Sequence, residues 1–359
     1  MSVPNRTSRT ARRYRRRRAA VAGVGVLVLV VAAVGVVTVL DGSRDTPDAV
    51  PSDANPGSGN RAPSALLALA VTGGDVPLVA VVGSGEEREP AALVLPSEMI
   101  VTVPGAGEVP VGAAGSLAAD SMHVAVSNVV GTWTEAYASL ELQALRSLVG
   151  QVGGLTVDLP ALVTLAGTPL GPGPTEMTGE QVAAYVGAPG ADSADRWAAV
   201  LEALLAQETS LARVRAASGD KDAADAIWSA ARGAAVEVPV TETLAGTVMI
   251  PAQPELDTQI GDLFGTPSPT PALVQNGSGM PGVGEDVAAL IIPEGFRIVL
   301  STNAESFDHE RTEVVAIGPE HRDAARVVHG ALGVGVVRVA QVPSGLADVT
   351  IVVGKDFQA

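Results

Sequence analysis

An uncharged segment of 22 residues, Ala19–Leu40, follows an arginine-rich N-terminus and limits how the chain can be arranged. As a helix with about 1.5 Å rise per residue it is roughly 33 Å long, enough to cross the hydrocarbon core of a bilayer. A cleaved signal peptide and a buried helix are the alternatives. The segment is longer than the apolar region of a signal peptide, and the residues after it lack a small-residue cleavage site. The sequence therefore predicts an uncleaved transmembrane helix at 19–40.

The residues before this segment, 1–18, form a basic arm without acidic residues. Cytoplasmic flanks of membrane helices carry an excess of Lys and Arg, so the arm predicts a cytoplasmic N-terminus. We therefore expect a single-pass protein of the plasma membrane whose bulk is extracytoplasmic. The eight arginines of the arm are Arg6, Arg9, Arg12, Arg13, Arg15, Arg16, Arg17 and Arg18.

The remainder of the chain is acidic. The arm holds eight of the 23 basic residues, so 15 basic residues stand against 39 acidic ones from Ala19 onward. Such a surface repels phosphate backbones, which disfavours nucleic-acid binding by the globular part. The chain has no cysteine, so disulfides and thiolate metal sites are excluded as well.

Composition and periodicity divide the rest of the chain. Pro, Gly, Ser and Asp dominate 41–63, which is typical of a flexible stalk. A domain at 64–264 alternates short apolar runs with amphipathic segments, which predicts an α/β fold. Its predicted strands are 66–71, 77–82, 91–96 and 155–159. Its predicted helices are 134–153, a segment at 177–186 with a capping box of Thr178 and Gln181, and 194–208, extended by a second helix through Ile227 and Trp228.

A second linker, GTPSPTP at 265–271, cannot continue a helix and predicts a domain boundary. The last domain, 272–359, alternates strands and helices again, which predicts a small βαβ-βαβ sandwich. Its predicted strands are 272–276, 295–301, 312–318 and 348–354, and its predicted helices are 283–292 and 321–332.

A glycine-rich loop in this domain has the G-x-G-x-x-G form of a dinucleotide-binding loop, with Gly277, Gly279 and Gly282. The domain is too small for two mononucleotide-binding halves, and Pro281 would crowd the helix entry. Glu305 has the right separation for a ribose contact but lies in a polar loop. A glycine turn at a helix start is the better interpretation, and we expect no bound cofactor.

Other catalytic patterns are absent from the sequence. His321 and His329 share a predicted helix but are two turns apart, too far for one metal ion, and His123 and His309 are isolated. Ser84 and Ser97 have no spaced His and Asp partners, so a serine hydrolase is unsupported.

The order of features from Asp75 to Glu202 resembles the LytR-CpsA-Psr (LCP) domain of membrane-anchored envelope phosphotransferases. GDVPLVAVV resembles the family's aspartate-led strand, with Asp75 as the aspartate, and LVLPSEMIVTVPG its Pro-Arg-Asp strand and turn. YASLELQALRSLVGQVGGLTVDLP resembles the central helix, Gly-Gly turn and strand. MTGEQVAAYV and RWAAVLEAL resemble the helices on either side of the arginine cluster. The resemblance implies an α/β/α domain with a mixed central sheet.

The family's polar residues are largely replaced. The family transfers a polymer from a polyprenyl-pyrophosphate carrier to a wall glycan, which requires arginines for the pyrophosphate and carboxylates for a divalent metal. Ser97 stands in the place of the Pro-Arg-Asp arginine and Glu98 in that of its aspartate. Gly187 and Pro189 stand where two further arginines belong, and Arg196 alone matches the last arginine of the cluster.

Three site residues therefore remain by resemblance: Asp75, Glu98 and Arg196. At about 1.5–3 kcal/mol per charged hydrogen bond, losing three arginines costs roughly 5–9 kcal/mol of pyrophosphate binding. We expect the domain to be a degenerate LCP-like fold without catalysis. The alternative is a divergent active phosphotransferase in which Arg88, Arg146 or Arg213 supplies the missing charge and Asp75 and Glu98 hold Mg²⁺.

The last domain resembles the LytR C-terminal domain over nearly its whole length. ALVQNGSGMPGVGEDVAALIIPEGF resembles its start, and TEVVAIGPEHRDAARVVHGALG with the closing DVTIVVGKDF resembles its second half. That domain commonly follows an LCP domain.

Together these features predict a membrane-anchored scaffold or binding protein of cell-wall polymer assembly. Its expected partners are a wall glycopolymer, a polyprenyl-linked precursor or an LCP-family protein. Direct DNA binding as a transcriptional attenuator is disfavoured, because there is no helix-turn-helix signal and the acidic bulk is expected outside the membrane.

Overall fold

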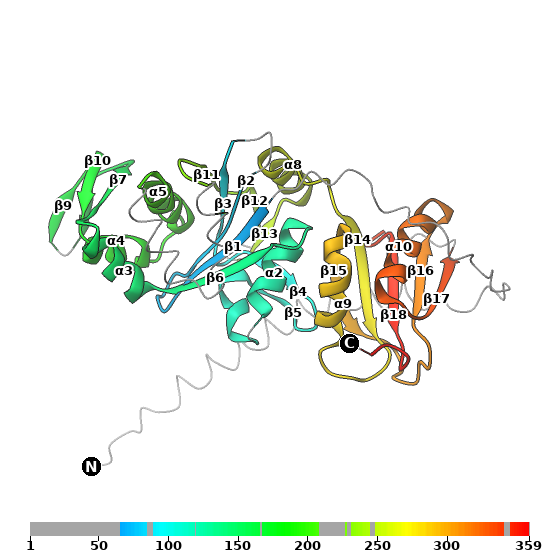
Figure 1. Ribbon diagram of the computed structural model, residues 1–359. Coiled ribbons are helices and arrows are strands. Elements are labelled where there is room, and N and C mark those ends of the chain that lie inside the picture. Colours follow the sequence, from blue (N-terminus) through cyan, green and yellow to red (C-terminus); the bar gives the residue numbers. More distant parts are fainter. Residues whose placement is uncertain are drawn as a thin grey trace, which may run out of the picture.

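The computed structural model describes residues 65–84, 89–118, 120–165, 167–207, 227, 231–244, 248–340 and 345–358. The predicted arm, transmembrane helix and stalk lie outside the described residues, as does most of the predicted helix through Ile227. Across the described ranges, no helix combines the length and apolarity needed to span a bilayer. Two five-stranded sheets organise this part of the chain (Figure 1).

The first sheet is mixed, as the sequence predicts. Its order is β11-β3-β2-β1-β6, in which β2 runs antiparallel to β1 and β3, while β6 is parallel to β1 and β11 to β3. Four strands therefore point the same way, and their carboxyl ends share one edge. The strands are β1 (Ala65–Thr72), β2 (Leu78–Ser84), β3 (Ala91–Leu95), β6 (Ala136–Glu141) and β11 (Ala235–Glu237).

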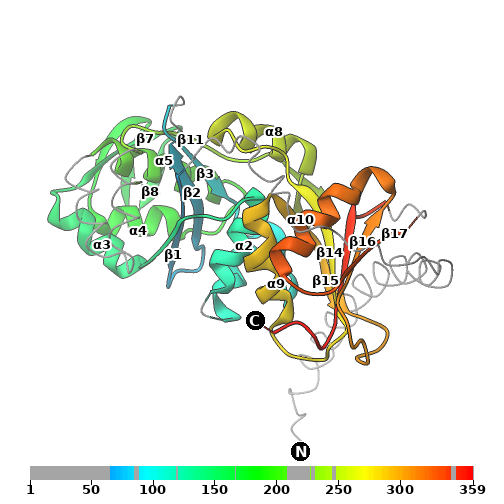
Figure 2. The same cartoon turned by 45° about the vertical axis from the view of Figure 1, so that its right-hand side comes forward.

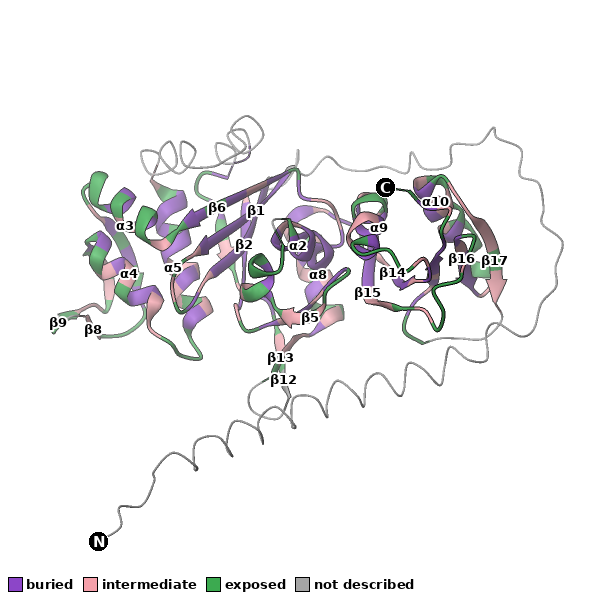
Figure 3. Ribbon diagram, turned by 90° about the horizontal axis from the view of Figure 1, so that it is seen from below, coloured by how far each residue is buried: buried purple, intermediate pink, exposed green. Residues whose placement is uncertain are grey.

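Both faces of this sheet are buried, which explains the unbroken apolar runs of β1 to β3. Leu67 and Leu69 pack into a core with α3 (Leu142–Gln151), α4 (Gly179–Gly187) and α5 (Ser193–Ala206). Leu66 and Ala68 point to the other side, into a core with α2 (Ser121–Val130) and α8 (Gln253–Phe264). The result is a three-layer α/β/α arrangement with the central strands enclosed (Figure 3).

The helix predicted across 134–153 is wrong in its first half. Residues 136–141 form β6, and the helix α3 begins only at Leu142. Ala136, Ala138 and Leu140 are buried, and the residues between them are more exposed, which is the two-residue period of a strand. Pairing with β1 outweighs the local helical spacing of the apolar residues.

The helix predicted at 177–186 is confirmed as α4, together with its capping box. The Thr178 hydroxyl accepts a hydrogen bond from the Gln181 amide at 3.3 Å, and the Gln181 side chain accepts one from the Thr178 amide at 2.8 Å. The helix predicted at 194–208 is α5.

Smaller elements complete this part, and of these the sequence predicted only β7. They form four two-stranded sheets, β7 with β10, β8 with β9, β12 with β13, and β4 with β5, and the last pair leads into a 3₁₀ turn before α2. These elements are β4 (Ile100–Val103), β5 (Gly107–Pro110), η1 (Val111–Ser116), β7 (Leu155–Leu159, which was predicted), β8 (Val163–Leu165), β9 (Thr168–Leu170), β10 (Gly173–Met177), β12 (Thr241–Leu244) and β13 (Val248–Pro251).

The second sheet has the order β15-β14-β18-β16-β17, and α9 and α10 pack on one face of it (Figure 2). Strands β14, β15 and β18 are parallel, and β16 and β17 form a second parallel pair that runs the opposite way. The elements are β14 (Thr270–Asn276), α9 (Val283–Ile291), η2 (Ile292–Glu294), β15 (Phe296–Asn303), β16 (Glu313–Ile317), η3 (Pro319–His321), α10 (Arg322–Leu332), β17 (Val336–Ala340) and β18 (Val349–Val353).

Two βαβ units are present here, but the second ends on a strand that the sequence did not predict. That strand is β17, whereas the closing apolar run forms β18 in the middle of the sheet. Strand β14 begins at Thr270, inside the linker predicted at 265–271. The domain boundaries at 64–264 and 272–359 stay predictions.

The side chain of Asn128 on α2 joins the part of the chain built on the first sheet to the part built on the second. These two parts are called the first and the second half below. Its Oδ1 accepts from the Ile298 amide at 2.7 Å, and its Nδ2 donates to the carbonyls of Ile298 at 2.9 Å and Thr102 at 3.1 Å. Strand β15 is an edge strand, so Asn128 satisfies backbone groups that a neighbouring strand would otherwise pair.

Arg297, the residue before Ile298, is buried at the same junction. Its Nε and Nη2 donate to the carbonyls of Asn128 at 3.1 Å and Val129 at 2.7 Å, near the end of α2. Its Nη1 pairs with Asp257 Oδ1 on α8 at 2.7 Å. Burial lowers the pKa of the Arg297 guanidinium, and Asp257 opposes that shift. The junction thus fixes the second sheet against α2 and α8.

Candidate functional site

The carboxyl edge of the first sheet carries an acidic side chain after each of its four parallel strands. Asp75 lies in the turn after β1, and Glu98 in the turn after β3. Strands β6 and β11 end on Glu141 and Glu237. All four side chains are exposed. The edge where the resemblance places a pyrophosphate site is therefore negatively charged.

The turns that carry Asp75 and Glu98 both approach Gly112 of η1. The Gly112 amide of η1 donates to the Ser97 carbonyl at 2.9 Å. A Cβ added to Gly112 would lie 2.7 Å from Cγ of Pro77 and 2.9 Å from Cβ of Ser97. Only a glycine at 112 permits this approach without a shift of its neighbours.

Trp197 connects α5 to the same edge. Its buried indole Nε1 donates to the Val76 carbonyl at 3.1 Å, directly after Asp75. The resemblance used Trp197 only to align Arg196, and sequence reasoning missed its positioning role. A buried tryptophan requires a partner for its N–H, which is the signal that could have revealed it.

Arg196 is turned toward its own loop. Its Nη2 donates to the Ala188 carbonyl, and its Nη1 pairs with Asp192 Oδ1 at 3.4 Å. The guanidinium carbon lies 5.9 Å from the centre of the Tyr185 ring. The side chain is 12% exposed, and its Nε is buried with no hydrogen-bond partner among the described residues. Two of its donor groups are therefore already used to close the segment 188–192.

The surroundings of Tyr185 contain charges of both signs. Burial raises the pKa of the Tyr185 hydroxyl, Arg196 opposes the shift, and Asp192 and Asp195 add to it. The two aspartates offset the single positive charge that remains here. The segment is placed where the resemblance puts an arginine cluster, but its charges are mixed.

The other basic residues considered as substitutes do not complete a cluster in the described part of the chain. Arg146 on α3 pairs with Glu180 on α4 and donates to Gln143 at 3.4 Å. Arg88 and Arg213 lie outside the described residues. Among the ion pairs of the described residues, none joins Asp75 or Glu98 to a basic side chain.

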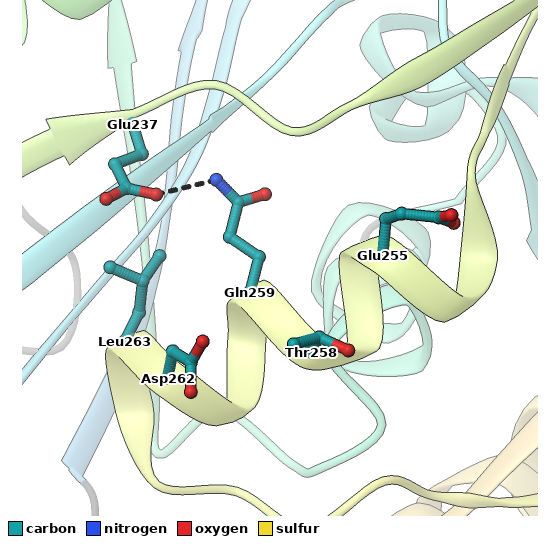
Figure 4. A pocket seen from close by; sticks show the side chains of 6 residues that line it. All are labelled: Glu237, Glu255, Thr258, Gln259, Asp262 and Leu263. Atoms are coloured by element: carbon teal, nitrogen blue, oxygen red, sulfur yellow. Dashed lines mark hydrogen bonds between the residues drawn. The ribbon is translucent and has the colours of Figure 1, made fainter.

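A pocket of about 350 Å³ opens between β11 and α8 (Figure 4). Gln259 Nε2 crosses it and donates to Glu237 Oε2 at 2.7 Å, while Gln259 Oε1 is buried and has no partner in the described part of the chain. Three of its six lining residues are acidic, which disfavours an anionic ligand. The lining residues are Glu237, Glu255, Thr258, Gln259, Asp262 and Leu263.

The glycine-rich loop of the second sheet uses its amides internally. Asn276 Oδ1 accepts from the amides of Ser278 at 3.1 Å and Gly279 at 2.9 Å. Gly282, in the left-handed region with φ of 83°, is the N-cap of α9. The loop is a glycine turn at a helix start, as predicted, and the amides of Ser278 and Gly279 are not directed at a phosphate.

The histidines stay apart from one another. His123 Nε2 lies 2.9 Å from the Thr134 carbonyl, and His321 Nε2 lies 3.6 Å from Asp348 Oδ1. In the described ranges, no group of three or more His, Cys, Asp or Glu side chains is arranged to hold a metal ion. Asp75 and Glu98 are the two carboxylates that the resemblance assigns to a cation.

Comparison with known proteins identifies the C-terminal part of the chain. Residues 271–357 match the family model described as LytR cell envelope-related transcriptional attenuator. The match confirms the predicted LytR C-terminal domain. No curated protein matches the chain.

Several solved structures of LCP proteins resemble the chain. Bacillus subtilis TagV has 15% identity and a TM-score of 0.47, over 57% of this chain and 99% of TagV. The LytR-Csp2A-Psr enzyme from Actinomyces oris has 16% identity and a TM-score of 0.46, over 58% of this chain and 91% of that one. The LytR-CPS2A-psr family protein YwtF (TagT), solved with octaprenyl pyrophosphate lipid, has 17% identity and a TM-score of 0.43, over 56% and 90%.

These structures resemble the chain with TM-scores below 0.5, so they carry no argument about its domains. Their identities are too low to carry an activity or a ligand to this chain. The residues of the site itself determine which chemistry it can perform.

Proposed function

We propose that this protein is a single-pass, extracytoplasmic protein of the cell envelope whose LCP-like part binds a partner without catalysing phosphotransfer. The position of Arg196 is the observation that supports this most directly. Its guanidinium is engaged by Ala188 and Asp192, and the carboxyl edge of the first sheet carries carboxylates. A pyrophosphate at this edge would meet repulsion in place of the bidentate arginine contacts that phosphate binding needs.

The proposed partner is a cell-wall glycopolymer, its polyprenyl-linked precursor, or an active LCP protein. The matched LytR C-terminal domain supports a role in the envelope. The uncharged segment at 19–40 and the basic arm before it support attachment to the plasma membrane with the N-terminus inside. In this arrangement the protein acts as a scaffold for polymer assembly.

The first test is a polymer-transfer assay. Full-length protein in vesicles is incubated with Mg²⁺, a polyprenyl-pyrophosphate-linked glycopolymer and peptidoglycan, and polymer attached to peptidoglycan is measured. We expect no transfer above that of vesicles alone. Transfer that disappears in Asp75→Ala or Arg196→Ala would contradict the proposal and establish the divergent phosphotransferase, with Mg²⁺ held by Asp75 and Glu98.

A second test restores one of the missing arginines. A Cβ added to Gly187 would meet no atom of the described residues within 4 Å, so the backbone at this position has room for the Cβ of Gly187→Arg. We expect this variant to bind a polyprenyl pyrophosphate about tenfold or more tightly than the native chain, because one charged hydrogen bond contributes ~1.5–3 kcal/mol. Binding is measured by co-sedimentation with vesicles that contain the radiolabelled lipid.

Gly150→Arg on α3 is the matched control, because Gly150 also has open space around its Cα. We expect it to leave lipid binding unchanged. Equal gains in both variants would show a general effect of positive charge, and tight binding by the native chain would mean that the missing arginines are not limiting.

A further inference from the structure

Phe307 differs from the other phenylalanines of the chain because its side chain is exposed to solvent. Three of the four phenylalanines, Phe264, Phe296 and Phe357, are at most 2% exposed. Phe307 is 47% exposed, and Met280 is 39% exposed. Single exposed apolar residues are common, but two large ones on adjoining loops form a patch that needs an explanation.

Phe307 and Met280 lie on loops that follow β15 and β14, at the shared carboxyl end of these parallel strands (Figure 1). Gly279 brings the loops together. A Cβ there would lie 3.2 Å from Phe307 Cβ and 3.3 Å from its Cγ, and Gly279 has φ of 76°. The second glycine of the G-x-G-x-x-G pattern therefore supports the phenyl ring.

The Phe307 loop is fixed on both sides by hydrogen bonds. The Ala304 amide donates to the Asn276 carbonyl at 2.9 Å, and the His309 amide donates to the Gly277 carbonyl at 3.2 Å. Within the loop, the Asp308 amide donates to Ser306 Oγ at 3.0 Å. A loop whose backbone is held in one conformation loses little entropy on binding, which favours its use as an interface anchor.

Acidic residues surround the exposed ring. Glu305, Asp308 and Glu310 are exposed, and Asp308 is 93% exposed. Lys355 pairs with Glu310 at 2.8 Å and lies 3.9 Å from Asp308, and Arg311 is exposed after Glu310. Three acidic residues thus stand against two basic ones, and the surroundings keep a net negative charge. We name Met280, Phe307 and these three acidic residues the Phe307 patch.

We propose that the Phe307 patch is a docking site for a polypeptide segment that carries an apolar side chain between basic residues. Charge selects this occupant. A second copy of the chain brings its own excess of acidic residues, and an anionic polymer or membrane would also be repelled. A cationic segment is attracted over the same distance and gains apolar contact at Phe307.

This site lies on the second sheet, away from the carboxyl edge of the first, and it does not depend on the proposed function. The test uses full-length protein in detergent and fluorescent peptides in which Lys and Arg flank a central Trp-Leu pair. A second peptide replaces that pair with Ser-Gly at equal charge. Binding is followed by anisotropy at several salt concentrations.

We expect the native chain to bind the Trp-Leu peptide and Phe307→Ser to bind it about tenfold more weakly. The double variant Glu305→Gln/Asp308→Asn should bind more weakly and show a smaller dependence on salt. Leu162→Ser, which removes a 64% exposed leucine of the first half, should bind as the native chain does. The melting temperature of Phe307→Ser should change little, because about half of the side chain is exposed.

Equal binding of both peptides to the native chain, or unchanged binding by Phe307→Ser, would overturn the proposal. Two other outcomes would also overturn it. In these, Phe307→Ser keeps its peptide binding but loses either self-association or binding to anionic vesicles.

Discussion

Arg297→Ala is expected to lower the free energy of unfolding by about 3–5 kcal/mol. The guanidinium is 8% exposed and its partner Asp257 is 18% exposed, so the change leaves a carboxylate in a nearly dry junction without its counter-charge. It also removes donors from the carbonyls of Asn128 and Val129. Both losses occur where the second sheet meets α2 and α8.

Urea unfolding followed by tryptophan fluorescence measures this effect. Trp133 packs against the core of the second sheet and Trp197 lies in the core of the first, so both halves are observed. Arg338→Ala is the matched control, because Arg338 is 54% exposed and pairs with Glu313 at 3.0 Å on the surface. We expect it to cost less than about 1 kcal/mol.

The paired substitution Asp257→Leu/Arg297→Met tests the cause. A buried ion pair can often be replaced by apolar residues of similar volume at little cost, so this variant should be more stable than Arg297→Ala. If Arg297→Ala destabilised the protein no more than Arg338→Ala does, the junction would contribute little to stability.

Gly284→Ala is expected to destabilise the protein by about 1–3 kcal/mol, although alanine favours helices. Gly284 lies in the first turn of α9 against the β4–β5 turn. Its added Cβ would lie 2.5 Å from the Gly105 nitrogen and 2.7 Å from Ser301 Oγ. Those two atoms form a hydrogen bond at 3.0 Å across the junction, so the methyl group would force the halves apart.

Gly330→Ala in α10 is the control for Gly284→Ala. A Cβ at Gly330 would meet no atom within 4 Å, so this change should stabilise the protein by about 0.5–1 kcal/mol. Thermal unfolding of both variants should therefore shift in opposite directions. A stabilising shift for both would show that the junction tolerates a separation of a few tenths of an ångström.

Much of the fold could be predicted because burial leaves a simple pattern. The strands β1 to β3 are enclosed on both faces and read as unbroken apolar runs, and the capping box of α4 is a local signal. Strand β6 was mispredicted because its apolar residues also fit a helical spacing. Its pairing with β1, about seventy residues away in the chain, decided its conformation.

The candidate site was predictable in part for the same reason. Asp75 and Glu98 follow strands that proved parallel, so their turns meet at one edge. The orientation of Arg196 toward Ala188 was not predictable, because it depends on the closure of the 188–192 segment. Trp197 donates to the carbonyl of Val76, more than a hundred residues earlier in the chain, and Arg297 pairs with Asp257, forty residues earlier. No local pattern encodes either contact.

By itself, the sequence determined the uncharged segment and its flanking charge, the acidity of the rest, the alternation of strands and helices, and the identity of the C-terminal domain. These properties depend on composition, local spacing and neighbouring residues. Only the tertiary structure decided that Arg196 closes its own loop, that Arg297 and Asn128 join the two halves, and that the glycine-rich loop supports Phe307. Each of these depends on which distant backbone groups and side chains are brought into contact, and the burial that fixes their energies exists only once the chain has folded.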